Sequence, residues 1–263
     1  MDNASPPVLS LICEASFALE DYSRAEELLR IFKDHFETSD YMRSAYKLLA
    51  SGQMAAGKLD EAMATIVEAQ EEYGTDPKVA WAQLMKSDAL RQMGKFEEAR
   101  EENLNVMGVP AWRGMPYAQA TYQLGQVEED AGNLLKAHAY YQRAYFQYKG
   151  QGEWASLGYL GAARVLEKLS QDGSLSTDEQ ASYEEARIST LKAMLLDKYA
   201  NKTPQADEAR ELLGPAIVAE MEAIIESGVD TNIVVTLEKA KAEPRATTPS
   251  DGEQNAAKQG GDA

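Results

Sequence analysis

The sequence predicts an all-α protein, an α-solenoid of about five helical hairpins followed by a C-terminal capping helix and a disordered tail. The first observation is a small residue that recurs at intervals of 37, 37, 38 and 49 residues, at Ala25, Ala62, Ala99, Ala137 and Ala186. The second is a Tyr, Leu or Phe three residues before each, at Tyr22, Leu59, Phe96, Leu134 and Tyr183. An internal period of this size is typical of repeat proteins. The third is a composition rich in Ala, Leu, Glu, Gln, Met and Lys, which favours helix.

The repeats are expected over residues 6–202. The five hairpins are predicted at residues 6–39, 43–76, 80–113, 118–151 and 154–202. The fifth carries an insertion at residues 170–180, rich in turn and capping residues, which should lengthen the loop between its two helices. We interpret it as a tolerated surface insertion, with a functional loop as the alternative.

The fourth hairpin shows the pattern most completely. Helical spacing of three or four residues relates Tyr117, Thr121, Leu124 and Glu128 in the first helix. The same spacing relates Leu134, Ala137, Tyr141, Ala144 and Tyr148 in the second, so each set lies on one face of its helix. Gly132 between them suits a helix end because glycine accepts a left-handed backbone at little cost.

This pattern resembles the tetratricopeptide repeat (TPR) family. The residues that carry the resemblance in the fourth hairpin are Leu124-Gly125, Gly132, Leu134, Ala137, Tyr141 and Ala144. Leu160-Gly161 repeats the first-helix signature, and Gly57, Leu59 and Ala62 repeat that of the turn and second helix. The first hairpin matches less well, with Cys13 at the small position. The resemblance implies a right-handed solenoid in which stacking of neighbouring hairpins buries a continuous core.

Two further helices are expected after the repeats, over residues 203–228, to cap the last hairpin. Thr203 should be an N-cap with Pro204 at the first helical position, and Ile217, Val218, Met221, Ile224 and Ile225 should form one apolar stripe. Residues 229–243 are ambiguous and are assigned to a helix. Residues 244–263 contain no apolar residue larger than Ala and should be disordered.

The net charge of −17 argues against nucleic acid and anionic membrane surfaces as partners, because both attract Lys and Arg. No apolar run is long enough to span a membrane. The chain as written has no export signal, which predicts a cytoplasmic protein. A signal missing from this sequence would instead place it in the periplasm or at the cell envelope.

Catalytic and metal-binding motifs are absent from the sequence. Cys13 stands alone, which excludes an intrachain disulfide and a thiolate metal cluster, and we interpret it as a buried helix residue. His35 and His138 lack the spacing of a metal site, and no phosphate-binding or nucleophile-elbow motif occurs. We therefore expect no enzyme activity, no cofactor and no metal.

The resemblance also implies a partner-binding groove lined by the first helices of successive hairpins. The candidate groove residues are Lys47, Trp81, Leu84, Asp88, Arg91, Tyr122, Gln126 and Glu129. The alternative is that Trp81 and Tyr122 pack between hairpins. The Lys/Asn/Arg clamp with which chaperone-binding TPR domains hold a C-terminal carboxylate is missing, since the matching positions carry Ser10, Glu14, Leu84 and Met85.

The first functional hypothesis is a non-catalytic scaffold that binds a segment of a protein or peptide partner in the groove. The second is a cell-envelope TPR factor of outer-membrane or division assemblies, which residues 198–213 resemble. The third is an enzyme on an α/α hairpin fold, which requires acidic residues that converge in one pocket with raised pKa values. The identity of the partner and the oligomeric state stay open.

Overall fold

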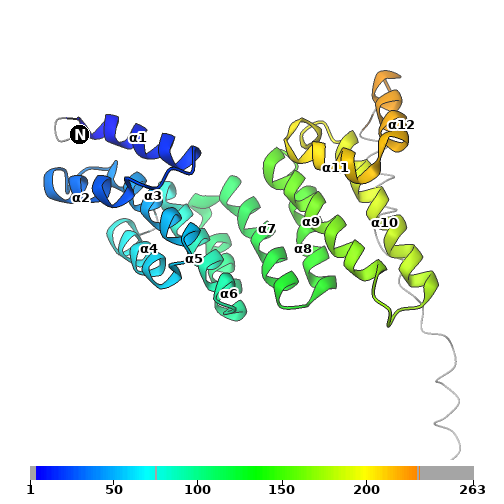
Figure 1. Ribbon diagram of the computed structural model, residues 1–263, viewed down its shortest axis with the longest axis horizontal. Helices are drawn as coiled ribbons and strands as arrows, with labels where there is room; N and C mark the ends of the chain where they lie inside the picture. The colour runs from blue at the N-terminus through cyan, green and yellow to red at the C-terminus, as the bar shows by residue number, and fades with distance from the viewer. Residues whose placement is uncertain (1–3, 75, 230, 232–263) are drawn as a thin grey trace, which may run out of the picture. The chain divides into compact units, whose positions relative to one another are not determined.

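The computed structural model describes residues 4–74, 76–229 and 231, and within them it contains helices and no strand (Figure 1). Most helices begin and end near the breaks that the sequence predicts. The α-helices are α1 (Pro6–Ala18), α2 (Ala25–His35), α3 (Met42–Ala55), α4 (Leu59–Tyr73), α5 (Ala80–Gln92), α6 (Phe96–Gly108), α7 (Met115–Asp130), α8 (Leu134–Gln147), α9 (Gly152–Ser170), α10 (Thr177–Leu196), α11 (Gln205–Leu213) and α12 (Pro215–Glu226). Short 3₁₀ turns are η1 (Pro77–Val79), η2 (Pro110–Trp112) and η3 (Ala200–Lys202).

The chain divides into two compact units, one up to Gly158 and one from Tyr159. In the first unit each helix packs against its neighbours in the chain: α3 pairs with α4, α5 with α6, and α7 with α8. The first helices of successive hairpins also touch, α1 with α3, α3 with α5 and α5 with α7 (Figure 1). This second set of contacts brings side chains of three first helices to one place.

The recurring small residues are buried in the packing between helices. Ala25, Ala62, Ala99, Ala137 and Ala186 are all at most 2% exposed. Gly125 shows why size matters, because a Cβ atom there would lie 2.5 Å from Cδ1 of the fully buried Tyr141. Any larger residue at this position would force α7 and α8 apart.

Glycine occupies the left-handed position in the turns inside the second, third and fourth hairpins, where the first hairpin has Glu20 at a φ of +53°. Gly57, Gly94 and Gly132 have φ values of +72°, +76° and +79°, and the next helix begins two residues after each. A left-handed backbone is strained for residues with a side chain, which accounts for the glycines of the repeat.

The insertion in the second unit lengthens both the loop and the helices. The loop between α9 and α10 runs over residues 171–176, against three residues between α7 and α8, and α10 already begins at Thr177, within the predicted insertion. The reason is a capping box in which the Ser176 hydroxyl accepts from the backbone of Glu179 while the Glu179 carboxylate accepts from the backbone N–H of Ser176. The resulting α9 and α10 have 19 and 20 residues, against 11 to 16 in the preceding α-helices.

Two helices follow α10, as the sequence predicts. α11 and α12 pack against α10 and against each other, with Met221 buried at 3% exposure and Ile225 still 43% exposed. The expected N-cap at Thr203 is wrong, because its hydroxyl donates instead to the carbonyl of Ala200 at 2.8 Å. Apart from residues 229 and 231, the segments 229–243 and 244–263 lie outside the described residues.

No helix in the described part of the chain combines the length and the apolar character that a membrane span needs.

Candidate functional site

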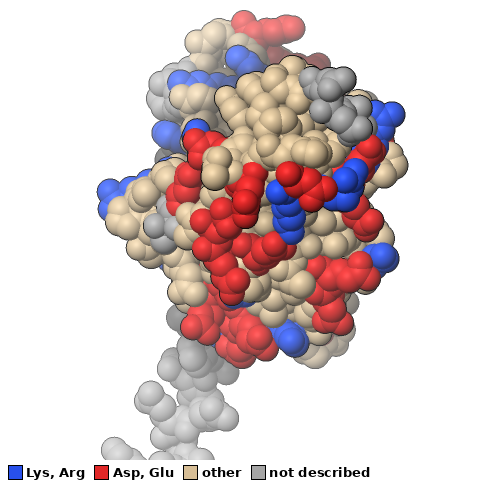
Figure 2. All heavy atoms as spheres, turned by 90° about the vertical axis from the view of Figure 1, so that its left-hand side faces the viewer, with Lys and Arg blue, Asp and Glu red and all other residues tan. Residues whose placement is uncertain are grey.

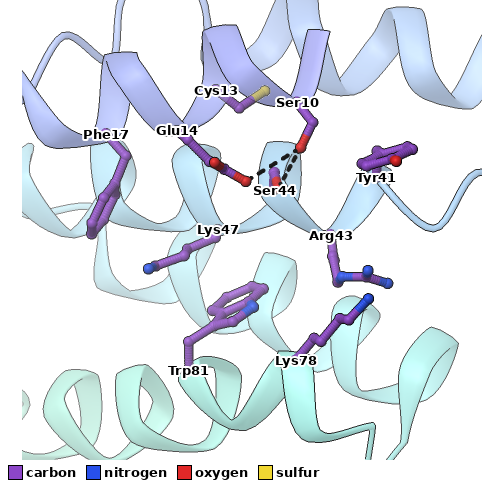
Figure 3. Close-up of a pocket in the computed structure, with 10 residues that line it drawn as sticks. All are labelled: Ser10, Cys13, Glu14, Phe17, Tyr41, Arg43, Ser44, Lys47, Lys78 and Trp81. Atoms are coloured by element: carbon purple, nitrogen blue, oxygen red, sulfur yellow. Dashed lines mark hydrogen bonds between the residues drawn. The ribbon is translucent and has the colours of Figure 1, made fainter. Parts of the chain in front are cut away.

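A pocket of about 470 Å³ opens between α1, α3, η1 and α5 in the first unit. Each of these elements contributes side chains to it (Figure 3). The lining residues are Ser10, Cys13, Glu14 and Phe17 of α1, Tyr41, Arg43, Ser44 and Lys47 at and after the start of α3, Lys78 of η1 and Trp81 of α5.

Helical spacing explains how two of these helices present several side chains to the pocket. Ser10, Glu14 and Phe17 follow one another at intervals of four and three residues on one face of α1. Ser44 and Lys47 stand three residues apart on α3, facing them. The hydroxyls of Ser10 and Ser44 lie 2.9 Å apart in a hydrogen bond that joins the two helices.

Lys47 is a half-buried cation in this pocket. Its ammonium lies 4.1 Å from the centre of the Phe17 ring, a cation–π contact. Burial lowers the pKa of Lys47, and the nearby Glu14 carboxylate partly counteracts the shift. Among the described residues no carboxylate forms an ion pair with it, so its charge is balanced by the ring and by Glu14 at longer range.

Arg43 and Lys78 supply two further cations on another side of the pocket (Figure 3). The Arg43 side chain is only 11% exposed, and the carboxylates of Asp40 and Asp76 stand 3.9 Å from its guanidinium. No hydrogen-bond acceptor within the described residues meets that guanidinium, and none pairs with the exposed ammonium of Lys78.

Trp81 forms the apolar wall of the pocket. It packs against the buried cluster of α1, α2 and α3 and against the cluster of Ala50, Ile66 and Ala82, while part of it still lines the pocket. The Trp81 ring thus packs between hairpins, as one of the two interpretations predicts, and also lines the pocket, while a role in partner binding stays a prediction.

Charge distinguishes the pocket from the surface around it. Its lining carries three cationic side chains and one carboxylate, whereas the whole chain has 26 Lys and Arg against 43 Asp and Glu. Figure 2, which views the molecule from the left-hand side of Figure 1, shows acidic side chains over much of the face it draws. The pocket lining therefore has a positive formal charge within a chain whose net charge is negative.

Cys13 touches the pocket without offering it a reactive group. The residue is 1% exposed, and burial, with a smaller contribution from Glu14, raises the pKa of its thiol to about 12. Because the thiolate is the nucleophilic and metal-binding form, the side chain acts here as a small apolar residue. This agrees with the structural role predicted from the sequence.

Three predicted groove residues on α5 lie outside the pocket. Leu84 is 2% exposed and packs with Val106, Trp112 and Ala120, so it belongs to the core and not to a binding surface. The reason is that η2 places Trp112 over this part of α5. Asp88 and Arg91 form an ion pair at 2.7 Å, and Arg91 also bonds Asp130 of α7.

The three predicted residues on α7 belong to a separate cluster. The Tyr122 ring contacts the rings of Tyr141 and Trp154 at 5.4 and 5.9 Å, which supports packing between hairpins. Glu129 accepts a hydrogen bond of 2.6 Å from the Tyr141 hydroxyl. Gln126 is half-buried on the same helix. The structure thus brings only Lys47 and Trp81 of the predicted set to the pocket.

Two titratable features bear on the enzyme hypothesis. The pKa values of four described carboxyl groups are lowered, by hydrogen bonds from serines at Asp21, Asp172 and Glu179 and, against the effect of burial, by Arg100 and Asn133 at Glu128. No trio of His, Cys, Asp or Glu in the described part of the chain is placed to hold a metal ion. No observation in these residues favours the enzyme hypothesis.

Comparison of the chain with protein-family models and with curated proteins finds no match. The site is therefore interpreted from its own residues.

Sequence reasoning missed Arg43, Lys78, Phe17 and Tyr41 as pocket residues. Arg43 precedes Ser44 and Lys47 on α3, so the helical face of Lys47 could have indicated it. Lys78 lies in a 3₁₀ turn, outside the helical register from which the groove was predicted, and the sequence pattern gives no signal for it.

Proposed function

We propose that this chain is a non-catalytic TPR-like scaffold, a right-handed α-solenoid that binds a segment of a protein partner across the first helices of its hairpins. The observation that carries the proposal is the pocket lined by α1, α3 and α5 together. Such a site exists only because successive first helices touch, and it joins an aromatic wall to charged groups. Aromatic residues and Arg are the residue types that contribute most to protein interfaces.

The test is affinity capture from the native source with wild-type protein and with three variants. Trp81→Ala and Lys47→Ala change the pocket, whereas Leu104→Ala removes an apolar side chain that is 49% exposed on the second helix α6. We expect a captured partner to be lost from both pocket variants and retained by Leu104→Ala. Capture that is equal in all four proteins would contradict the proposal.

The same scaffold could work in the cytoplasm or at the cell envelope. Fractionation of the native protein distinguishes these two locations, and the captured partner should be found in the same fraction.

A further inference from the structure

Three cations and one carboxylate, that of Glu14, line the pocket, and the carboxylates of Asp40 and Asp76 stand beside Arg43. Lys47 is half-buried with no ion pair among the described residues, and the Arg43 guanidinium, 11% exposed, has carboxylates only at 3.9 Å. Lys78 adds a third positive charge, and Figure 3 shows it approaching Arg43. Cations that are partly removed from water are unfavourable unless an anion pairs with them. Lys47, Lys78 and the loosely paired Arg43 can therefore each gain a closer ion pair from an anionic ligand.

The cations occupy two separate positions. Figure 3 shows Lys47 on one side of the pocket and Arg43 with Lys78 on the other, with the Trp81 ring between them in this view. An occupant that pairs with both positions needs two anionic groups with an apolar group between them. An internal stretch of polypeptide with the order acidic, apolar, acidic has this arrangement.

The acidic residues nearby limit the charge of each anionic group. Glu14 lines the pocket, and Asp40 and Asp76 flank Arg43. These carboxylates repel a phosphate, which carries close to two negative charges, more strongly than they repel a singly charged carboxylate. Charge complementarity thus favours Asp or Glu side chains over a phosphorylated residue.

We propose that the pocket binds an internal acidic segment of a partner, with two side-chain carboxylates on Lys47 and on the Arg43–Lys78 pair and an aromatic or aliphatic side chain against Trp81. This inference rests on the proposed scaffold function and names its partner class. It differs from capture of a C-terminal carboxylate, because both anionic groups come from side chains.

The probe is a fluorescently labelled peptide with a central phenylalanine between glutamates and with both ends blocked. Its amide isostere carries glutamine at each acidic position. Titration of the full chain, followed by fluorescence anisotropy at low salt, should show binding at least tenfold tighter for the acidic peptide. Lys47→Gln and Lys78→Gln should each weaken it about tenfold, as loss of a charge-assisted contact does. Lys58→Gln, whose side chain pairs with Glu61 outside the pocket, should leave it unchanged.

Several outcomes would overturn the inference. These are equal binding of the acidic and amide peptides, unchanged binding in Lys47→Gln and Lys78→Gln, binding only of a peptide with a free C-terminus, and tighter binding of a phosphoserine peptide. Lys78 is exposed, so its replacement does not threaten folding. If the partner from affinity capture still requires Trp81 while the acidic peptide fails to bind, the scaffold function stands and only the partner class is wrong.

Discussion

The pocket between α1, α3 and α5 and the cluster formed by α7, α8 and Trp154 both include residues predicted for the groove, yet these residues meet different neighbours. In the pocket, Lys47 and Trp81 border open space. In the cluster, Tyr122 is covered by Tyr141 and Trp154, and Glu129 already holds the Tyr141 hydroxyl. A first-helix position in a repeat is therefore not by itself a binding position.

The difference comes from the residue that the neighbouring helix supplies. Gly125 lets the Tyr141 ring lie against α7, and that ring reaches both Tyr122 and Glu129. At the pocket, the side chains facing Lys47 are Ser10, Glu14 and Phe17 of α1, which do not fill the space. The large Tyr141 ring fills the space beside α7, whereas the side chains of α1 leave the space beside Lys47 open.

The largest effect on stability is expected in the cluster around Tyr141, where large side chains fill the space. Tyr141→Ala should lower the free energy of unfolding by about 4 kcal/mol, because it empties a site that is 0% exposed. Trp81→Ala should cost less, roughly 2 kcal/mol, because part of that ring already faces the pocket. Urea unfolding followed by circular dichroism measures both. An equal loss in the two variants would contradict the distinction between closed and open sites.

Burial of an ionisable group gives the second test. His138 on α8 is 6% exposed, and burial lowers its pKa to about 4 from 6.5, so it stays neutral in the folded chain. As the pH falls from 6.5 to 4 the unfolded chain gains this proton first, and folding loses about 3 kcal/mol. His138→Gln should remove that part of the pH dependence in urea titrations.

His35→Gln is the matched control for the histidine experiment, because His35 is exposed on α2. If both variants keep the wild-type dependence between pH 6.5 and 4, burial of His138 does not limit stability in acid.

The smallest effect is expected at the open pocket. Lys47→Met should raise the free energy of unfolding at pH 7 by about 0.5 kcal/mol, since it removes a charge that burial disfavours and places a thioether near Phe17. Because burial lowers the pKa of Lys47, the penalty is present at neutral pH and disappears once the pH exceeds the pKa of the unfolded chain. The gain should therefore vanish in unfolding experiments at strongly alkaline pH. A loss of stability at pH 7 would show that the Phe17 contact outweighs the burial cost.

Helix positions could be predicted from local residues because the signals for helix ends are local. Gly132 and Leu134 indicate the start of α8, and the helix begins at Leu134 as expected. Ser176 and Glu179 carry a signal of the same kind, which places the start of α10 at Thr177, within the segment that was predicted to lengthen the loop. At Thr203 a local signal was present but the predicted N-cap did not form. Its hydroxyl donates instead to the carbonyl of Ala200 in η3, an acceptor that the sequence pattern does not reveal.

The candidate site could be predicted only in part, because it depends on contacts between hairpins. Lys47 and Trp81 follow from the register of the first helices. Leu84 has the same register, but Trp112 comes from a linker turn and buries it. That contact is set by the path of a linker, on which the Trp112 indole N–H donates to the carbonyl of Asp76, 36 residues earlier in the chain.

The reactivity of Cys13 can report how often the first helix, α1, detaches from the rest of the first unit. The single thiol is buried beside the pocket with a pKa of about 12, so a thiol reagent at neutral pH can modify it only when α1 separates from α3. The rate of that modification reports how often the first helix detaches. An occupant bridging α1, α3 and α5 would hold the helix in place and slow the reaction, so occupancy could be followed without any added label.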